Sequence, residues 1–385
     1  MKIVSLGDIV QFASGGTPAR SRPEYYRGDI PWVTGADITP EGNILERHRI
    51  SREAVSQSAT TVASPGALLL VTRTSVGKVA RVKDSVAFSQ DITAILPDAL
   101  VCDVGYIEHF LRSRQTFLVA QARGATIRGI TRQVVASLRM ELPPLAEQRR
   151  IAALLDGVAT LRRQQESFVT ACQDAKASLF NKYIESDTTT ARDMKPLAAV
   201  VRDGTVVTYG IVQAGPDVED GVPYIRTGDL VDGQIAVNQL RKTSPEIAER
   251  FKRSRVSVGD IVMSIRATVG TTAMVPLGLE GANLTQGTAR IAPGPRLHPL
   301  FLLEYLRSPR AQRWIQAQVK GATFREITLA RLRQLPVVQP PMEVQQRFVS
   351  ALEAVEAMAQ ISRRKSYLLT ELHASLQHRA FSGEL

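Results

Sequence analysis

The chain has 385 residues and a formal net charge of +11 at pH 7. A chain of this length normally forms two or more domains, and the positive charge, shared between the two halves, favours a polyanionic partner such as nucleic acid. The only cysteines, Cys102 and Cys172, argue against a disulfide framework or a zinc site. Asp8 comes too early for a signal peptide, and no apolar run has the length of a membrane span. We therefore expect a cytoplasmic protein.

One long internal repeat dominates the sequence. The segment GATIRGIT, from Gly124 to Thr131, returns as GATFREIT from Gly321 to Thr328. A proline pair and a glutamine-bearing, helix-like run follow each copy. A long period of self-similarity determines the architecture, and this period is half of the chain. The sequence therefore predicts a duplicated domain-plus-helix unit.

The first part of each repeat is predicted to be a domain of mixed secondary structure, at residues 1–143 and 197–340. Residues 67–72 and 260–265 are strand-like and follow turn-forming glycines. Helical spacing, with apolar residues three and four apart, occurs at residues 105–113 and 299–308. The predicted fold class is α+β, with two similar domains. A polar segment at residues 185–196 is predicted to link the two repeats.

The second part of each repeat is predicted to be one long helix, at residues 144–184 and, with a C-terminal tail, at 341–385. The proline pairs mark the starts, because proline suits the first turn of a helix. Apolar residues then recur at alternating steps of four and three, which predicts that the helices pair as a coiled coil. A helix lying on its own domain is the alternative, which the length disfavours. The predicted coiled-coil positions include Leu154, Val158, Leu161, Phe168, Val355, Met358, Leu369 and Leu372.

The motifs of common catalytic sites are missing from the sequence. It has no phosphate-binding Gly-Lys-Ser/Thr loop, no dinucleotide fingerprint, no His-Glu-x-x-His and no Gly-x-Ser-x-Gly. The five histidines do not recur at matched positions of the repeat. We predict no catalytic residue and no metal site. Acidic residues beside glycines at strand ends are expected to cap turns: Asp8, Asp37, Asp229 and Asp260.

The residues that do recur suit contacts with phosphates and bases. Thr hydroxyls, backbone amides and basic side chains commonly bind phosphate oxygens, while arginine pairs with guanine and glutamine or asparagine with adenine. Each residue alone is equally well explained as a solvated loop side chain, but the recurrence of the set favours binding. The candidates are Arg73, Thr74, Ser75, Lys78, Gln90, Arg123, Thr126 and Arg128 in the first repeat, and Arg226, Arg266, Thr268, Asn283, Gln286, Lys320, Thr323 and Arg325 in the second.

As a set, these features resemble the specificity subunit of a type I restriction-modification system. The resemblance covers the whole chain and is carried by LPPLAEQRRI at 142–151, the run at 335–348, the two Gly-Ala-Thr segments, and the Gly-Asp-Ile turns at Gly7 and Gly259. It implies two target recognition domains, each reading one half of a bipartite, asymmetric DNA site. The two helices would pack antiparallel and set the spacer between the half-sites.

The resemblance also implies partners. The helices would dock two methyltransferase subunits, which carry S-adenosylmethionine and methylate adenine, and restriction subunits would complete the nuclease. No cofactor is expected in this chain. Gln148 and Gln345, near the helix starts, join the predicted coiled-coil and docking positions. The second copy departs at Glu326, where the first has Gly129, since a carboxylate there would repel phosphate.

Three other interpretations stay open on the sequence alone. The chain could be a coiled-coil scaffold whose basic domains bind proteins or RNA. It could be the specificity partner of another multi-subunit methyltransferase or nuclease. An enzyme with an unrecognised site is the least favoured, because no nucleophile or metal cluster supports it.

Overall fold

The structure is a computed structural model that describes residues 2–124, 128–180, 182–183, 194–321, 325–382 and 384–385. The chain divides into two compact units. Unit 1 is Met1–Ser167 with Arg363–Leu385, and unit 2 is Phe168–Ser362. The division cuts both long helices, so each unit holds one domain of mixed secondary structure and parts of both helices.

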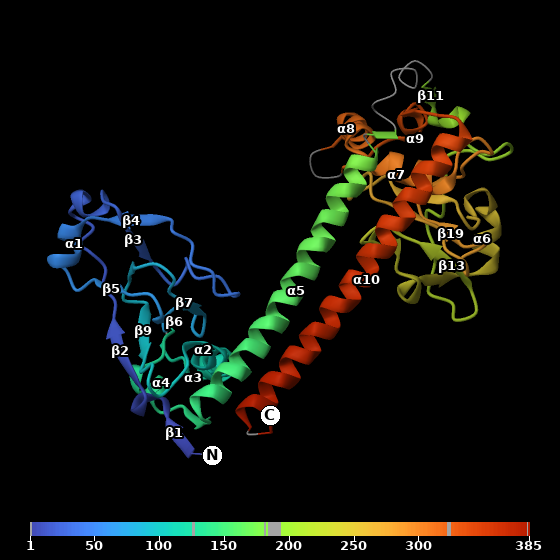
Figure 1. The fold of residues 1–385 in the computed structure, drawn as a ribbon. Helices are drawn as coiled ribbons and strands as arrows, with labels where there is room; N and C mark the ends of the chain where they lie inside the picture. The colour runs from blue at the N-terminus through green and yellow to red at the C-terminus, as the bar shows by residue number, and fades with distance from the viewer. Residues whose placement is uncertain (1, 125–127, 181, 184–193, 322–324, 383) are drawn as a thin grey trace. The chain divides into compact units, whose positions relative to one another are not determined.

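Two four-stranded sheets form the domain of unit 1 (Figure 1). One has the order β2-β9-β6-β7 with antiparallel neighbours throughout. The other has the order β4-β3-β8-β5, in which β3 and β8 are parallel. A separate pair, β1-β10, joins the start of the chain to the residues that precede the long helix. The strands are β1 (Lys2–Ser5), β2 (Val10–Ser14), β3 (Ile30–Val33), β4 (His48–Ile50), β5 (Thr61–Ala63), β6 (Leu68–Val71), β7 (Val79–Arg81), β8 (Val86–Phe88), β9 (Ile92–Pro97) and β10 (Arg139–Leu142).

Short helices connect these strands, and polar side chains set where three of them begin. The side chains of Ser51, Asp103 and Thr131 each accept a hydrogen bond from a backbone N–H in the first turn of the helix that follows, which satisfies a donor that the helix itself leaves unpaired. The helices are α1 (Arg52–Ser56), α2 (Val104–Ser113), α3 (Gln115–Gln121) and α4 (Arg132–Ala136), with 3-10 turns η1 (Leu6–Asp8) and η2 (Pro23–Tyr26).

Unit 2 repeats this topology. Its larger sheet has the order β12-β20-β17-β18, and its smaller sheet, β16-β13-β19, again contains one parallel pair, β13 with β19. The pairs β11-β21 and β14-β15 complete it. The strands are β11 (Lys195–Pro196), β12 (Thr208–Tyr209), β13 (Val222–Ile225), β14 (Leu230–Val231), β15 (Gln234–Ile235), β16 (Arg241–Thr243), β17 (Ile261–Ser264), β18 (Thr272–Met274), β19 (Asn283–Leu284), β20 (Thr288–Ile291) and β21 (Pro336–Val337).

The helices of unit 2 follow the same pattern, with caps from Ser244, Ser308 and Thr328. The predicted strands and helices within the domains are thus confirmed in both repeats. The predicted linker ends in β11, and its residues 185–193 lie outside the described ranges. The helices are α6 (Pro245–Arg250), α7 (Pro299–Arg307), α8 (Pro309–Gln318) and α9 (Leu329–Leu332), with 3-10 turns η4 (Leu197–Ala199), η5 (Thr227–Asp229), η6 (Val237–Gln239) and η7 (Lys252–Ser254).

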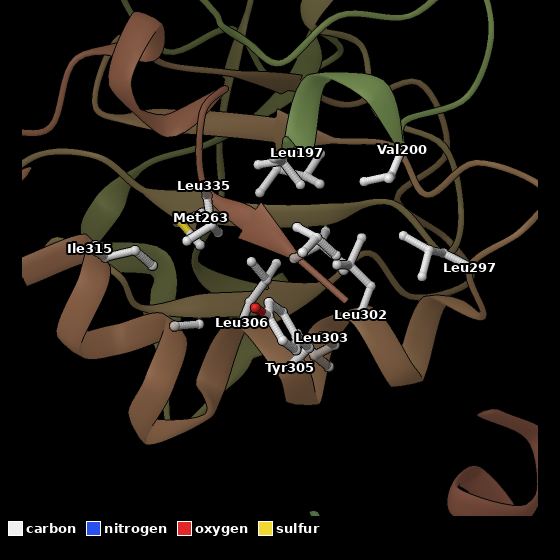
Figure 2. Close-up of a cluster of buried hydrophobic side chains, with 14 of the residues drawn as sticks. Leu197, Val200, Met263, Leu297, Leu302, Leu303, Tyr305, Leu306, Ile315 and Leu335 are labelled. Atoms are coloured by element: carbon white, nitrogen blue, oxygen red, sulfur yellow. The ribbon is translucent and has the colours of Figure 1, made fainter. Parts of the chain in front are cut away.

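A large apolar core holds each domain to its long-helix segments. In unit 2, Figure 2 shows Leu302, Leu306 and Tyr305 of α7 facing Leu197 and Leu335. The same cluster includes Phe348 of α10 and Phe180 of α5. Burial of side chains of this size stabilises by about 1.5–3 kcal/mol each, so the helix segments are part of the core of the unit.

The long helices are α5 (Leu145–Phe180) and α10 (Met342–Phe381). In unit 2 the end of α5 meets the start of α10, because the rings of Phe180 and Phe348 have centroids 6.2 Å apart and Lys176 pairs with Glu356. These two segments therefore run antiparallel. In unit 1 the last turn of α10 packs on the domain, with the ring of Phe381 5.2 Å from that of Tyr106.

Three of the eight apolar residues predicted for the heptad seam are buried or half-buried. Val158 is buried on α5, and Val355 and Leu369 are half-buried on α10. The other five apolar positions are 42–53% exposed. The more buried residues of each helix also recur at alternating steps of four and three. This row includes residues next to the predicted positions, such as Leu155 on α5 and Ala359 on α10. The apolar residues on each helix form two rows, one more buried and one exposed, and the predicted heptad positions combine residues from both rows. The positions placed wrongly in the seam are Leu154, Leu161, Phe168, Met358 and Leu372.

In the described ranges, no helix combines the length and the apolarity needed to cross a membrane. The two Gly-Asp-Ile turns lie in different places, since Asp8 is in η1 whereas Asp260 comes directly before β17.

Candidate nucleic-acid interface

Three loops of the first domain meet at one end of the larger sheet. The backbone N–H of Thr72, directly after β6, donates to the carbonyl of Asp91, directly before β9, at 2.8 Å. The N–H of Thr74 donates to the carbonyl of Arg128 in the Gly-Ala-Thr segment at 2.9 Å. The loop after β6 is therefore held on both sides by the other two.

The second domain forms the same junction. The N–H of Ile265, after β17, donates to the carbonyl of Gly287, before β20, at 2.9 Å, and the N–H of Ala267 donates to the carbonyl of Arg325 at 3.0 Å. We refer to these regions as the three-loop surfaces. They comprise residues 72–78, 89–91, 123–124 and 128–131 in the first domain, and 265–271, 285–287, 320–321 and 325–328 in the second.

The described residues that flank the two Gly-Ala-Thr segments pair in the same way. Arg123 and Gly129 exchange two backbone hydrogen bonds, both 2.9 Å long. Lys320 and Glu326 exchange the corresponding pair at 2.9 and 3.0 Å. The backbone of the basic residue that precedes each segment is thus held by two hydrogen bonds, and its side chain is exposed.

Backbone strain occurs at matched positions in the two surfaces. Thr74 has φ of 66° and Ala267 has φ of 57°, in the left-handed region that side chains other than glycine rarely adopt. Such a conformation costs about 1–3 kcal/mol and persists only where the surroundings enforce it. Here the enforcing contacts are the hydrogen bonds to Arg128 and Arg325. The same strained conformation therefore recurs at the same point of both surfaces.

The first surface presents several exposed basic and polar side chains. Arg73, Thr74, Arg123 and Arg128 are exposed, while Ser75 and Lys78 are half-buried. The ammonium of Lys78 donates to the carbonyl of Gly35 at 3.4 Å. Backbone amides and guanidinium groups at one sheet end form a surface suited to phosphate oxygens.

In the second surface one carboxylate is neutralised internally. Glu326 pairs with Arg266 at 3.3 Å, with both side chains about half exposed. This ion pair reduces the repulsion that Glu326 would exert on phosphate, and it occupies Arg266. Thr268, Lys320 and Arg325 are exposed, and Arg325 donates to the side chain of Gln316 at 2.6 Å.

Two of the remaining candidates are engaged within the domain. Asn283 is fully buried in β19 and its amide donates to the carbonyl of Ala248 at 3.2 Å, so the prediction that it contacts DNA is wrong. Arg226 pairs with the buried Asp229 at 2.7 Å, and this hydrogen bond raises the pKa of the guanidinium. The predicted contacts of Thr126 and Thr323 lie outside the described residues.

Sequence reasoning missed Arg132 at the edge of the first surface. Its guanidinium donates to the side-chain hydroxyl of Ser14 at 2.6 Å. The side chain is exposed. The second repeat has Leu329 at the corresponding helix start, so a search restricted to recurring residues does not find it.

The acidic turn residues have the capping role predicted for them. Each accepts a hydrogen bond from the backbone N–H three residues earlier, at 2.8–3.2 Å. Asp260 is also paired with Arg202 and Arg290, at 2.7 and 2.6 Å, and is fully buried. Among the described residues, no group of three His, Cys, Asp or Glu could hold a metal ion.

The prediction that Gln148 and Gln345 face a partner is wrong. Both are fully buried. The amide of Gln148 accepts from the N–H of Asp103 at 2.8 Å and donates to the carbonyls of Val101 and Pro143. These bonds fix the start of α5 to the domain. An amide in a polar helical run looks exposed when only the sequence is read.

Comparison with known proteins decides the family. The family model described as "Type I restriction modification DNA specificity domain" matches residues 1–166 and 213–371. The chain belongs to this family. The expected resemblance to type I specificity subunits is therefore confirmed, as is the presence of two similar mixed domains.

Curated relatives of this type I family agree. The EcoBI specificity subunit of Escherichia coli is 27% identical over 73% of this chain and 65% of its own length. The EcoR124I/EcoR124II specificity subunit, also of E. coli, is 30% identical over 41% of this chain and 40% of its own length. The match to the MjaVIII specificity subunit of Methanocaldococcus jannaschii is 20% identical and covers the whole chain and 92% of that subunit. The alignments to the first two relatives thus span less than two thirds of those proteins.

Solved structures show the same type I fold. The S subunit of the M. genitalium type I system has a TM-score of 0.59 at 14% identity, covering 99% of this chain and 96% of that one. A chain from a study of assembly and conformational transition in the type I system has a TM-score of 0.62 at 23% identity, covering 100% and 98%.

Proposed function

We propose that this chain is the DNA-reading specificity subunit of a type I restriction-modification complex, without a catalytic site of its own. The observation that carries the proposal is the recurrence of the three-loop surface in both domains. Two surfaces built alike, with different side chains on them, suit two different half-sites of one bipartite DNA sequence.

Electrostatics supplies the affinity in this account. The exposed arginines of each surface attract the phosphate backbone, which makes binding sensitive to salt. Base contacts then give the sequence preference. The second surface differs because Glu326 holds Arg266, so it offers one cation fewer to phosphate unless the pair opens.

The long helices are proposed to set the spacer as an antiparallel coiled coil. The supporting observation is that each unit contains the start of one long helix and the end of the other. Removing seven residues from either helix should shorten the accepted spacer, because the helix rises about 1.5 Å per residue. An unchanged spacer in such a variant would refute this role.

The helices are also proposed to dock two methyltransferase subunits. Supporting this, α5 exposes Leu154, Leu161 and Phe168 at seven-residue steps, and α10 exposes Met358 and Leu372. Exposed apolar rows on helices commonly mark protein partners. S-adenosylmethionine would be held by those subunits, restriction subunits would complete the nuclease, and the complex would act in the cytoplasm.

Mapping methylated adenines tests the proposed function. The chain is co-expressed with its methyltransferase partner, and the host genome is sequenced with methylation detection. The expected result is a bipartite motif with a fixed gap. If the two proteins associate and no new methylation appears, the chain is a scaffold instead.

A further inference from the structure

Gln90 and Gln286 occupy the same place in the two domains. In the first domain, Ser89 donates its N–H to the carbonyl of Val33 at 2.8 Å, directly before Gln90. In the second, Thr285 donates its N–H to the carbonyl of Ile225 at 3.2 Å, directly before Gln286. Val33 and Ile225 end the matched strands β3 and β13.

The residues that follow the glutamines match as well. Asp91 and Gly287 are the acceptors that anchor the loops after β6 and β17. Each glutamine therefore lies between two equivalent backbone contacts. At the spacing that relates Arg73 to Arg266, the counterpart of Gln90 would be Asn283, and only the structure shows that it is Gln286.

Both side chains lie on the three-loop surfaces with their amides unused. Gln90 is exposed and Gln286 is half-buried. Within the described part of the chain, neither side-chain amide has a hydrogen-bond partner. Arg73 and Arg266 are the candidate phosphate ligands of these surfaces. The uncharged amides of the two glutamines therefore remain available to contact a base.

We propose that Gln90 and Gln286 are specificity-determining residues that each read an adenine in the half-site of their own domain. A carboxamide donates one N–H to N7 of adenine and accepts from its N6 amino group, a pairing that the other bases do not offer in the major groove. The inference rests on the proposed function. It adds that both half-sites contain an adenine at the corresponding position.

The test uses the complex of the full chain with its methyltransferase partner. Binding is measured to the mapped site and to duplexes that each change one base pair of it. Gln90→Ala should weaken binding to the mapped site by roughly tenfold or more and abolish discrimination at one A·T pair of the first half-site only. Gln286→Ala should do the same in the second half-site.

Two further variants sharpen the test. Gln90→Glu should shift the preference at that position from adenine to cytosine, because a carboxylate accepts from the cytosine N4 amino group. Gln11→Ala on β2 and Gln234→Ala on β15, both exposed, should leave every preference unchanged. Wild-type preferences retained by Gln90→Ala and Gln286→Ala overturn the inference, while the proposed function stands. Loss of site-specific binding by the wild-type complex would instead overturn the proposed function.

Discussion

Gln148 and Gln345 make the same three hydrogen bonds in the two repeats. Gln345 accepts from the N–H of His298 at 2.8 Å and donates to the carbonyls of Arg296 and Pro340 at 2.9 and 2.8 Å. The amide thus holds the helix start, the loop before α7 and the proline pair together. This relationship explains why a glutamine follows each proline pair at a fixed distance.

Replacing this amide should destabilise unit 2. Gln345→Ala leaves one backbone N–H and two backbone carbonyls without this partner, and an unpaired buried group costs about 1–3 kcal/mol. We expect the free energy of unfolding to fall by about 3 kcal/mol, measured by urea denaturation. The neighbouring Gln346→Ala, exposed on the same helix, should change it by less than about 0.5 kcal/mol. Equal effects of the two variants would contradict the clamp.

A second prediction concerns the end of α5. Phe180 comes from the first repeat but packs among Tyr305 and Phe348 in unit 2. Phe180→Ala should cost about 3 kcal/mol and should speed hydrogen exchange in unit 2 while leaving residues 2–124 unchanged. Phe168→Ala, on the same helix and 45% exposed, is the control. Faster exchange confined to the first domain would be inconsistent with this packing.

The ion pair between Arg266 and Glu326 gives a third prediction. Glu326→Gln frees the guanidinium and removes a charge that repels phosphate. DNA affinity should rise several-fold, and the salt dependence should steepen by about one counterion. The control is Glu343→Gln, an exposed carboxylate at the start of α10. Weaker binding by Glu326→Gln in a salt titration would show that the carboxylate supports the surface.

The fourth prediction is acid sensitivity of unit 1. His109 and Asp156 lie 2.9 Å apart in a cavity of about 270 Å³ that His373 also lines. The hydrogen bond from His109 lowers the pKa of Asp156, and burial lowers the pKa of His373. As pH falls below about 6.5, the unfolded chain takes up a proton that folded His373 refuses, and at lower pH the contribution of Asp156 is lost. Both effects reduce stability in acid.

Urea denaturation between about pH 7 and pH 4 checks this prediction. His373→Gln should flatten the upper part of the curve, and Asp156→Asn the lower part. His48→Gln, an exposed histidine in β4 of the same unit, should leave the curve unchanged. Greater stability of the wild-type unit 1 at pH 5 than at pH 7 would contradict the assignment.

The sequence predicted the architecture well because the repeat, the prolines and the glycine turns can be read directly from the order of the residues. It failed where burial decides the role. Asn283 and Gln345 are buried polar residues that donate to backbone carbonyls, and local composition does not reveal that. The heptad seam failed for a related reason. Each helix carries two apolar rows, and only packing shows that Leu155 is inside while Leu154 is outside.

The most direct test of the account compares paired arginine variants in DNA binding by the complex with its methyltransferase. The variants are Arg73→Ala with Arg128→Ala, and Arg266→Ala with Arg325→Ala. Each pair should lower affinity by at least roughly tenfold. The salt slope should fall by about two counterions for the first pair and by about one for the second, because Glu326 already pairs with Arg266. The control pair is Arg52→Ala with Arg250→Ala, exposed residues on α1 and α6, which should retain wild-type binding. Wild-type affinity and salt slope in either loop pair would contradict the claim that both three-loop surfaces bind DNA.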